Sequence, residues 1–387
     1  MYLDETATTK PTQLALDVFR EVSEKYWYNP SSMSEYSRDT TKLLSDSRAD
    51  IAGLIGADPS DIFFTSGSTE GANWIMQGFV PRGEEDLFRI VVSEIEHPCV
   101  WNTAMYLKSC GVRVDVLHVD ANGKVDPNVL DGILAMNEQS KRPTLVCVMD
   151  SNNEIGVIQD TRTIANVVHS HAGCFLFSDM TQSFAHSANI NVEDLGVDFA
   201  CASAQKFGGL KGVGFVYMKY HIITPLMYGG HQENGFRPGT ENVAAIRSMA
   251  AQFVKARQDI GFKDKELLSY FLRTLITLNI PGVIFNNNSD GLPGILSVTL
   301  PKGCDANTVI SLLDSEFDIQ VSAGSACSSG ENKPSRVLKA IGLSDDEARR
   351  TIRITVSKDM NTVSKNMNCE DFVAKLKQIV EMTKDGD

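Results

Sequence analysis

The chain lacks the sequence features of membrane and exported proteins. Across its 387 residues no apolar run approaches the roughly 18 residues of a membrane-spanning helix. The first residues, Met1-Tyr2-Leu3-Asp4-Glu5, form neither the basic nor the apolar region of a signal peptide. We therefore expect a cytoplasmic protein that does not act on a membrane.

Cysteine pairs at the spacing of metal sites are also lacking. The eight cysteines include no Cys-x-x-Cys pair, so we predict no metal ligand among them. Cys147, Cys174 and Cys201 lie in or beside apolar segments and are expected to be small core residues. This usage of cysteine favours a reducing compartment over a disulfide framework.

Positive charge is scarce. The chain has 36 lysine and arginine residues against 49 aspartate and glutamate residues, which gives a formal net charge of −13. A protein that grips a polyanion needs clustered Lys and Arg, so direct binding of nucleic acid is not expected. The composition, 42% apolar and 22% charged, is that of a soluble globular protein, and the length indicates two domains.

Short apolar segments alternate with amphipathic helical patterns over much of the chain. Strands are predicted at 61–65, 88–92, 112–117, 144–149, 175–178, 199–203 and 213–218. Helices such as 98–110 and 160–171 lie between them. This alternation predicts an α/β domain with a mostly parallel, seven-stranded sheet, whose ligands bind at the carboxyl ends of the strands.

The pattern changes after a long predicted helix at 242–260. Further strands are predicted at 295–300, 318–321 and 351–356, and helices at 306–316, at 334–341 and at the C-terminus. This order is typical of an α+β domain. We predict a large domain over 12–255, and a smaller α+β domain formed by residues 1–11 and 256–387.

Lys206 is the most informative single residue. It follows a predicted strand and stands in a run of small residues and glycines. A lysine held there against a ligand would be desolvated, which lowers the pKa of its amine and makes it a nucleophile for a Schiff base. Taken alone, a strand-end lysine that reaches water is the simpler interpretation.

Other strand ends carry residues that suit a phosphorylated ring. Ser68 and Thr69 begin a helix, where backbone N–H groups and the helix dipole favour phosphate, although they are also ordinary helix caps. His97, just before Pro98, can stack on a flat ring, move a proton or simply cap a helix. Asp179 follows a strand, where it can pair with a pyridine nitrogen or act as a cap.

The remaining candidates lie on loops and on one late strand. Thr240 ends a glycine-rich loop that could reach a phosphate, even one in a neighbouring subunit. Cys327 lies in a run of small residues that cannot pack a core, so its thiol is a candidate nucleophile. Arg353 stands between Ile352 and Ile354, and its planar fork suits a carboxylate or a surface ion pair.

Taken together, these segments resemble pyridoxal-phosphate-dependent cysteine desulfurases of the NifS and IscS type, in the class V aminotransferase family. The resemblance covers nearly the whole chain, and its motifs occur in the family's order. They are Tyr2-Leu3-Asp4, Asn29-Pro30-Ser31-Ser32, Glu96-His97-Pro98, Asn152-Asn153-Glu154-Ile155-Gly156-Val157, Gly324-Ser325-Ala326-Cys327 and Val337-Leu338-Lys339-Ala340-Ile341-Gly342. The fold implied is the type I fold of pyridoxal-phosphate transferases.

The resemblance also implies roles for residues. Lys206 would bind pyridoxal 5′-phosphate covalently, His97 would stack on its ring, and Asp179 would pair with the ring nitrogen. Cys327 would accept sulfur as L-cysteine becomes L-alanine, in a homodimer that passes the sulfur to a partner protein. The other implied site residues are Gln182 and Asn153 beside cofactor and substrate, Ser68, Thr69, Ser203, Gln205 and the neighbouring subunit's Thr240 at the phosphate, and Arg353 at the substrate carboxylate.

Several positions depart from the family pattern. Gln205 stands where the family usually has histidine before the lysine, and Glu5-Thr6, Leu210 and Met33 also differ. A selenocysteine lyase, or another lyase or aminotransferase of the same fold, is the alternative enzyme. A cofactor-loaded scaffold that docks a sulfur-accepting partner is the alternative outside catalysis. The destination of the sulfur stays open between iron–sulfur cluster assembly, tRNA thiolation and DNA sulfur modification.

Overall fold

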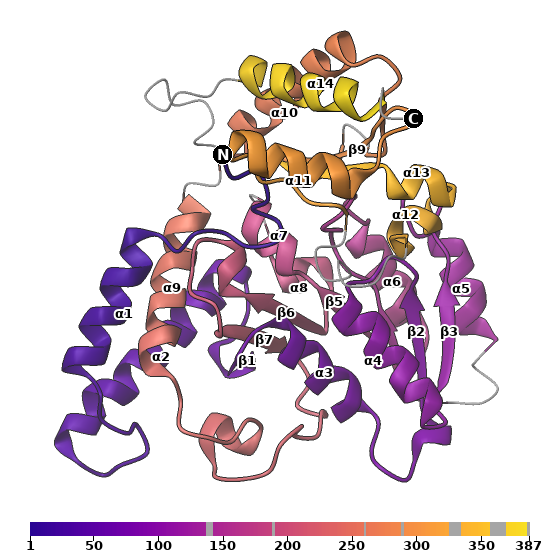
Figure 1. The fold of residues 1–387 in the computed structure, drawn as a ribbon. Helices are drawn as coiled ribbons and strands as arrows, with labels where there is room; N and C mark the ends of the chain where they lie inside the picture. The colour runs from indigo at the N-terminus through magenta and orange to yellow at the C-terminus, as the bar shows by residue number, and fades with distance from the viewer. Residues whose placement is uncertain are drawn as a thin grey trace.

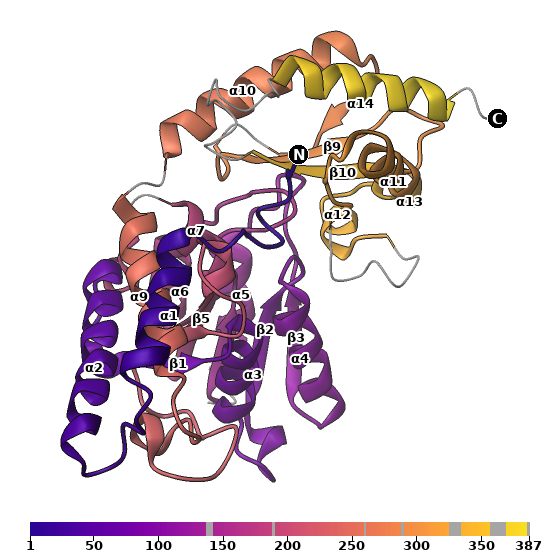
Figure 2. The same cartoon turned by 60° about the vertical axis from the view of Figure 1, so that its left-hand side comes forward.

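The chain folds into a larger part built on a wide sheet and a smaller part built on a short one, as Figures 1 and 2 show. The computed structural model describes residues 1–136, 142–187, 190–258, 261–287, 290–324, 334–356 and 369–384. In this described part, no helix combines the length and the apolar composition that crossing a bilayer requires.

A seven-stranded sheet forms the centre of the larger part, in the order β1-β7-β6-β5-β4-β2-β3. Its neighbours pair in parallel except β7, which is antiparallel to both β1 and β6. The strands are β1 (Ile62–Thr65), β2 (Arg89–Ser93), β3 (Arg113–Leu117), β4 (Thr144–Cys147), β5 (Cys174–Asp179), β6 (Phe199–Ser203) and β7 (Gly214–Met218). The predicted mostly parallel sheet is confirmed.

Helices cover both faces of this sheet, because alternate residues of each strand point to opposite sides. On β2, Ile90 and Val92 join one apolar cluster and Val91 joins the other. The first cluster includes α3 (Ser68–Phe79) and α4 (Pro98–Ser109). The second includes α2 (Glu35–Ile55), α5 (Pro127–Ala135), α6 (Thr161–Ser170), α7 (Thr181–His186), α8 (Val192–Leu195) and α9 (Val243–Gln258), and α1 (Gln13–Lys25) packs on α9.

The smaller part has its own sheet and its own apolar cluster. The antiparallel sheet has the order β10-β9-β8, with β8 (Ile284–Phe285), β9 (Ile295–Thr299) and β10 (Thr351–Thr355). The helices are α10 (Phe262–Asn279), α11 (Ala306–Phe317), α12 (Arg336–Ala340), α13 (Asp345–Arg349) and α14 (Cys369–Lys384).

Leu3, at the start of the chain, packs into the apolar cluster of the smaller part. Its backbone N–H donates to the Gln320 carbonyl at 2.8 Å, and its carbonyl accepts from Thr355 N–H at 2.8 Å. This packing agrees with the predicted assignment of the N-terminus to the small domain. The exact domain boundaries stay a prediction.

The strand predicted at 318–321 is wrong. Asp318 ends α11 with a φ of +53°, and the residues after it form only the isolated bridges Tyr2–Gln320 and Ser322–Arg353. The reason is that each partner segment contributes a single bridge, so no continuous ladder forms.

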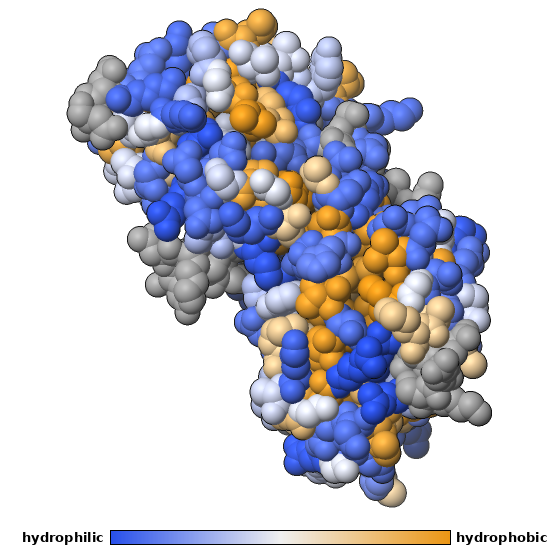
Figure 3. All heavy atoms as spheres, turned by 90° about the vertical axis from the view of Figure 1, so that its right-hand side faces the viewer, coloured by the Kyte–Doolittle hydropathy of each residue, from blue (hydrophilic) through white to orange (hydrophobic). Residues whose placement is uncertain are grey.

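Figure 3 shows the side of the molecule that is on the right in Figure 1, where an apolar band lies among hydrophilic side chains.

Candidate active site

A cavity of about 230 Å³ opens where several strands of the large sheet end and the N-terminal segment and β10 approach them. Nearly all of the predicted site residues line it, as expected for a parallel sheet. The predicted residues that it brings together are Ser68, Thr69, His97, Asn153, Asp179, Gln182, Ser203, Gln205, Lys206 and Arg353. The lining residues that were not predicted as site residues include Thr6, Ala7, Met149, Ser151, Glu154 and Thr181.

Lys206 ends the short 3₁₀ helix η3 (Ala204–Lys206), directly after β6. Its Nζ donates to the carbonyl oxygens of Thr6 at 2.8 Å and of Ala7 at 2.7 Å. These two acceptors lie about two hundred residues away in sequence, so no local sequence pattern could predict the contacts. The amine is therefore held at the cavity wall by the N-terminal segment rather than extended into water.

Three hydroxyl groups meet at the N-terminus of α3. Ser68 Oγ lies 2.6 Å from Thr181 Oγ1 and 2.9 Å from Ser203 Oγ, and Ser68 N–H donates to Ser203 Oγ at 2.7 Å. Gly67 precedes the helix with a φ of +146°, and a Cβ there would lie 3.0 Å from Ser203 Oγ, so glycine allows this close approach. A helix N-terminus surrounded by hydroxyl donors is a suitable site for a phosphate.

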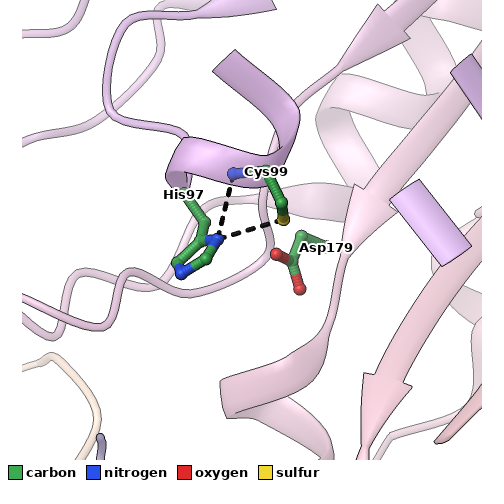
Figure 4. A group of neighbouring side chains, drawn as sticks. All are labelled: His97, Cys99 and Asp179. Atoms are coloured by element: carbon green, nitrogen blue, oxygen red, sulfur yellow. Dashed lines mark hydrogen bonds between the residues drawn. The ribbon is translucent and has the colours of Figure 1, made fainter. Parts of the chain in front are cut away.

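His97 and Asp179 both line the cavity from different elements, and Figure 4 shows them close together. His97 caps α4, and its Nδ1 accepts from the backbone N–H of Cys99 at 3.2 Å. Burial lowers the pKa of the His97 imidazole, which favours its neutral form. Asp179 ends β5 and is 5% exposed, and its Oδ1 accepts from Thr181 N–H at 3.0 Å. His97 is therefore both the N-cap of α4 and a cavity residue. Asp179 lines the cavity but is not the helix cap, because Met180 is the N-cap of α7.

The side-chain amides of Gln182 and Gln205 keep unused hydrogen-bonding capacity. Gln182 Nε2 donates to the Thr6 carbonyl at 3.1 Å. The Oε1 atoms of Gln182 and Gln205 are buried, and neither has a partner among the described residues. Both amides therefore remain available to a ligand in the cavity, Gln205 in the position where the resembled family usually has histidine.

Arg353 is a buried residue rather than a surface one. It is 1% exposed on β10, and its guanidinium donates to Asp4 Oδ1 at 2.6 Å. It also donates to the carbonyls of Asn153 at 2.9 Å and Gly324 at 3.0 Å. Its Nε has no partner among the described residues. Arg353 thus lines the cavity with a donor to spare, while Asp4 already balances its charge.

Two predicted site residues are not in the cavity. Thr240 is exposed on the loop before α9 and is absent from the described residues that line the cavity. This agrees with its predicted place at a neighbouring subunit, which stays a prediction. Cys327 lies outside the described residues, so its predicted role is also untested.

Glu96 is a buried acid that supports the site, and the sequence did not reveal its burial. Glu96 Oε1 accepts from Ser93 Oγ at 2.6 Å and from Met149 N–H at 2.7 Å, directly behind His97. Burial raises the pKa of Glu96 to about 8. Arg336 of α12 donates to the Glu96 carbonyl and stacks 4.1 Å from the centre of the Trp101 ring. These contacts hold the His97 segment against the smaller part.

Glu96 is expected to make stability depend on pH. Its folded pKa of about 8 lies above the ordinary 4.5, so the folded protein holds a proton that the unfolded chain releases. The free energy of unfolding should therefore fall by about 1.4 kcal/mol per pH unit between these two values. Glu96→Gln keeps the acceptor oxygen and should remove this slope. From pH 6 to pH 8 the free energy of unfolding should fall by about 2 kcal/mol in wild type and stay level at this site in the variant. Denaturant titrations at both pH values measure the difference, and equal slopes would contradict the assignment.

The groups in the cavity fit pyridoxal phosphate. The hydroxyl cluster at α3 suits the phosphate, and the Asp179 carboxylate suits a protonated ring nitrogen. The neutral His97 imidazole suits the ring face, and the Lys206 amine suits the aldehyde.

Comparisons with known proteins agree with this fit. Residues 1–362 match the Aminotransferase class-V family. The chain is 33% identical to the cysteine desulfurase IscS of Dictyoglomus turgidum, over 98% of this chain and 96% of that protein. Among solved structures it is similar to a NifS-like protein, with a TM-score of 0.88 at 29% identity over 99% of both chains. It is also similar to SspA in complex with cysteine, with a TM-score of 0.78 at 30% identity over 92% of this chain and 98% of that one.

The relatives account for the chemistry of the cavity as well as for the fold. The family is pyridoxal-phosphate-dependent. Relatives that this chain matches over nearly their whole length are named as cysteine desulfurases. The chain belongs to the aminotransferase class-V family and is a pyridoxal-phosphate-dependent enzyme with the function of a cysteine desulfurase.

Proposed function

We propose that the chain converts L-cysteine to L-alanine and leaves the substrate sulfur on Cys327 as a persulfide for a sulfur-accepting protein. The observation that carries this proposal is the convergence of Lys206, Asp179 and His97 in one cavity with the hydroxyl cluster at α3. The similar SspA structure in complex with cysteine supports cysteine as the substrate.

The residues of the cavity divide between holding the cofactor and orienting the substrate. When bound, pyridoxal phosphate supplies a protonated ring that accepts the electron pair of a substrate bond being broken. Ser68, Ser203 and Thr181 would hold the phosphate, and Thr69 would add its backbone at the helix start. Asp179 would hold the proton of the ring nitrogen.

Lys206 and Arg353 would act on the substrate itself. The Lys206 amine, positioned by the carbonyls of Thr6 and Ala7, would take the proton from the substrate α-carbon. Arg353 would bind the substrate carboxylate through its guanidinium, whose Nε has no partner among the described residues, with Asn153 beside it. His97 would cover the ring face and exclude water.

The sulfur step balances without a further reactant. The Cys327 thiolate attacks the sulfur of the substrate, a sulfur–sulfur bond forms, and the substrate Cβ–S bond breaks. The electron pair of that bond stays on carbon, which is reduced and protonated to the methyl group of alanine. The two sulfur atoms are oxidised to the persulfide level.

The proposed function is tested by its products. Incubation with L-cysteine and a thiol reductant should give alanine and sulfide in equal amounts, measured by amino-acid analysis and sulfide colorimetry. The same assay with selenocysteine compares the two substrates. Turnover of selenocysteine alone would support the alternative lyase, and no turnover with a loaded cofactor would support the scaffold alternative.

Asp179→Asn is expected to lower turnover more than cofactor binding. The neutral amide no longer favours a protonated ring nitrogen, and each unit of lost pKa difference is worth about 1.4 kcal/mol. Asp179 accepts from the backbone N–H of Thr181, and the amide oxygen of asparagine can accept the same bond, so the phosphate contacts and the cofactor should be retained. Steady-state rates and cofactor absorbance measure the two effects. An unchanged rate would show that Asp179 serves only to accept the hydrogen bond from Thr181 N–H.

We propose further that the enzyme is a homodimer in which Thr240 reaches the phosphate site of the other subunit. The loop that carries Thr240 is anchored in its own chain, because Glu233 pairs with Arg48 at 2.7 Å and accepts from Phe64 N–H at 2.9 Å. Arg237 also pairs with Glu70 of α3 at 2.8 Å, while Thr240 itself is exposed. Sedimentation should give a dimer, and a fully loaded, active monomer would refute the proposal.

A further inference from the structure

Three potential metal ligands meet at the edge of the cavity. His97 Nδ1, Cys99 Sγ and an Asp179 carboxylate oxygen all lie within 4.8 Å of one another, and Nδ1 is 3.0 Å from Sγ (Figure 4). His97 and Cys99 come from the start of α4, and Asp179 comes from the end of β5. Cys99 is not used by the proposed mechanism, so its place between the two cofactor-facing residues calls for a separate account.

Metal binding would replace hydrogen bonds that the ligand atoms make in this structure. Nδ1 of His97 accepts the backbone N–H of Cys99 at 3.2 Å, so in this arrangement Nδ1 carries the lone pair and Nε2 carries any proton. Cys99 is 9% exposed and Asp179 is 5% exposed. Thr181 N–H fixes the Asp179 carboxylate through Oδ1 at 3.0 Å, which is the kind of outer contact that orients a metal ligand.

Imidazole nitrogen, thiolate and carboxylate together are zinc ligands. A tetrahedral Zn²⁺ with bonds of about 2.0–2.3 Å holds its ligand atoms roughly 3.5 Å apart, so small side-chain rotations would bring these three into place. The thiolate and the carboxylate would balance the charge of a divalent cation. His97 and Asp179 line the cavity, so a fourth position would face it, as in sites with three protein ligands.

We propose that His97, Cys99 and Asp179 bind a thiophilic divalent cation such as Zn²⁺ in the cofactor-free protein, and that the metal and pyridoxal phosphate exclude each other. On binding, the Cys99 thiol releases its proton to water as the sulfur–metal bond forms. The exclusion rests on the proposed function, because it requires that His97 and Asp179 face the cofactor ring. The protein would then be open to the metal only before cofactor loading.

Cobalt serves as the first probe, because a cobalt–thiolate bond gives a charge-transfer absorption in the near ultraviolet. Cofactor-free protein in metal-free buffer should bind one Co²⁺ per chain with this band, and Zn²⁺ should displace it. Cys99→Ala and the isosteric Cys99→Ser should both lose the band. They should also weaken Zn²⁺ binding by more than about a hundredfold, since loss of an outer-shell partner alone costs 10–100-fold.

The other thiols provide the controls. Cys110→Ala removes an exposed thiol at the end of the same helix and should keep the band. Cys327→Ser should keep it as well. Loss of the band in either variant, with its retention in Cys99→Ala and Cys99→Ser, would overturn the proposed site. Circular dichroism of the two Cys99 variants checks that they fold.

The exclusion has its own measurement. Adding pyridoxal phosphate to the cobalt-loaded protein should abolish the charge-transfer band, and protein already loaded with cofactor should not develop it. A band that persists beside the bound cofactor would refute exclusion while leaving the metal site intact. Neither absorbance measurement depends on cysteine turnover. Failure of the proposed desulfurase function would therefore show separately, in the alanine assay.

Discussion

Lys206→Ala is expected to abolish turnover and the yellow colour of a covalently bound cofactor. Lys206 is the one amine among the described residues that line the cavity, so no other side chain there can take over its role. A positioned proton-transfer group alone contributes about 10²–10⁴-fold. The covalent hold on the cofactor is lost as well, so the rate should fall by at least about ten-thousandfold.

The fold should survive this substitution. The Lys206 amine makes hydrogen bonds to the Thr6 and Ala7 carbonyls, and each typical bond contributes only about 1 kcal/mol. Lys211→Ala is the matched control, since Lys211 is an exposed lysine in the same glycine-rich run. Cofactor absorbance and alanine production should be normal in the control. Normal turnover in Lys206→Ala would show that the lysine has been assigned wrongly.

The large sheet could be predicted because all of its strands except the edge strand β3 are buried on both faces. Continuous apolar runs such as 199–203 are typical of strands in a buried parallel sheet, and the predicted and observed bounds of β6 coincide. The direction of β7 could not be predicted, because the same apolar sequence pattern is compatible with parallel and with antiparallel pairing. β8 has only two residues and leaves no periodic signal.

The site was predictable where its residues follow strand ends. Lys206 after β6 and Asp179 at the end of β5 meet because the carboxyl ends of neighbouring parallel strands share one edge of the sheet. The contacts that join distant segments had no such signal. The ion pair between Arg353 and Asp4 spans nearly the whole chain. Strand alternation indicated that Arg353 faces away from Ile352 and Ile354, but not that this second face is buried as well.

Cys327→Ser is expected to bind cofactor and cysteine normally and yet to transfer no sulfur. Neither binding step uses the thiol, whereas the sulfur step requires a nucleophile that is ionised near neutral pH. A serine hydroxyl is far weaker in this respect than a cysteine thiolate. Alanine production should therefore fall to background, while the spectral change on adding cysteine remains.

The persulfide itself separates this role from a merely structural one. After incubation with cysteine, mass spectrometry should find added sulfur on the wild-type peptide that contains Cys327 and none on the serine variant. Cys110→Ser, which removes an exposed thiol just after α4, should carry the persulfide normally. Sulfur found instead on Cys304 or another cysteine, with alanine production intact in Cys327→Ser, would refute the assignment. The chemistry at Lys206 would then stand, but the sulfur would leave the cavity by another thiol.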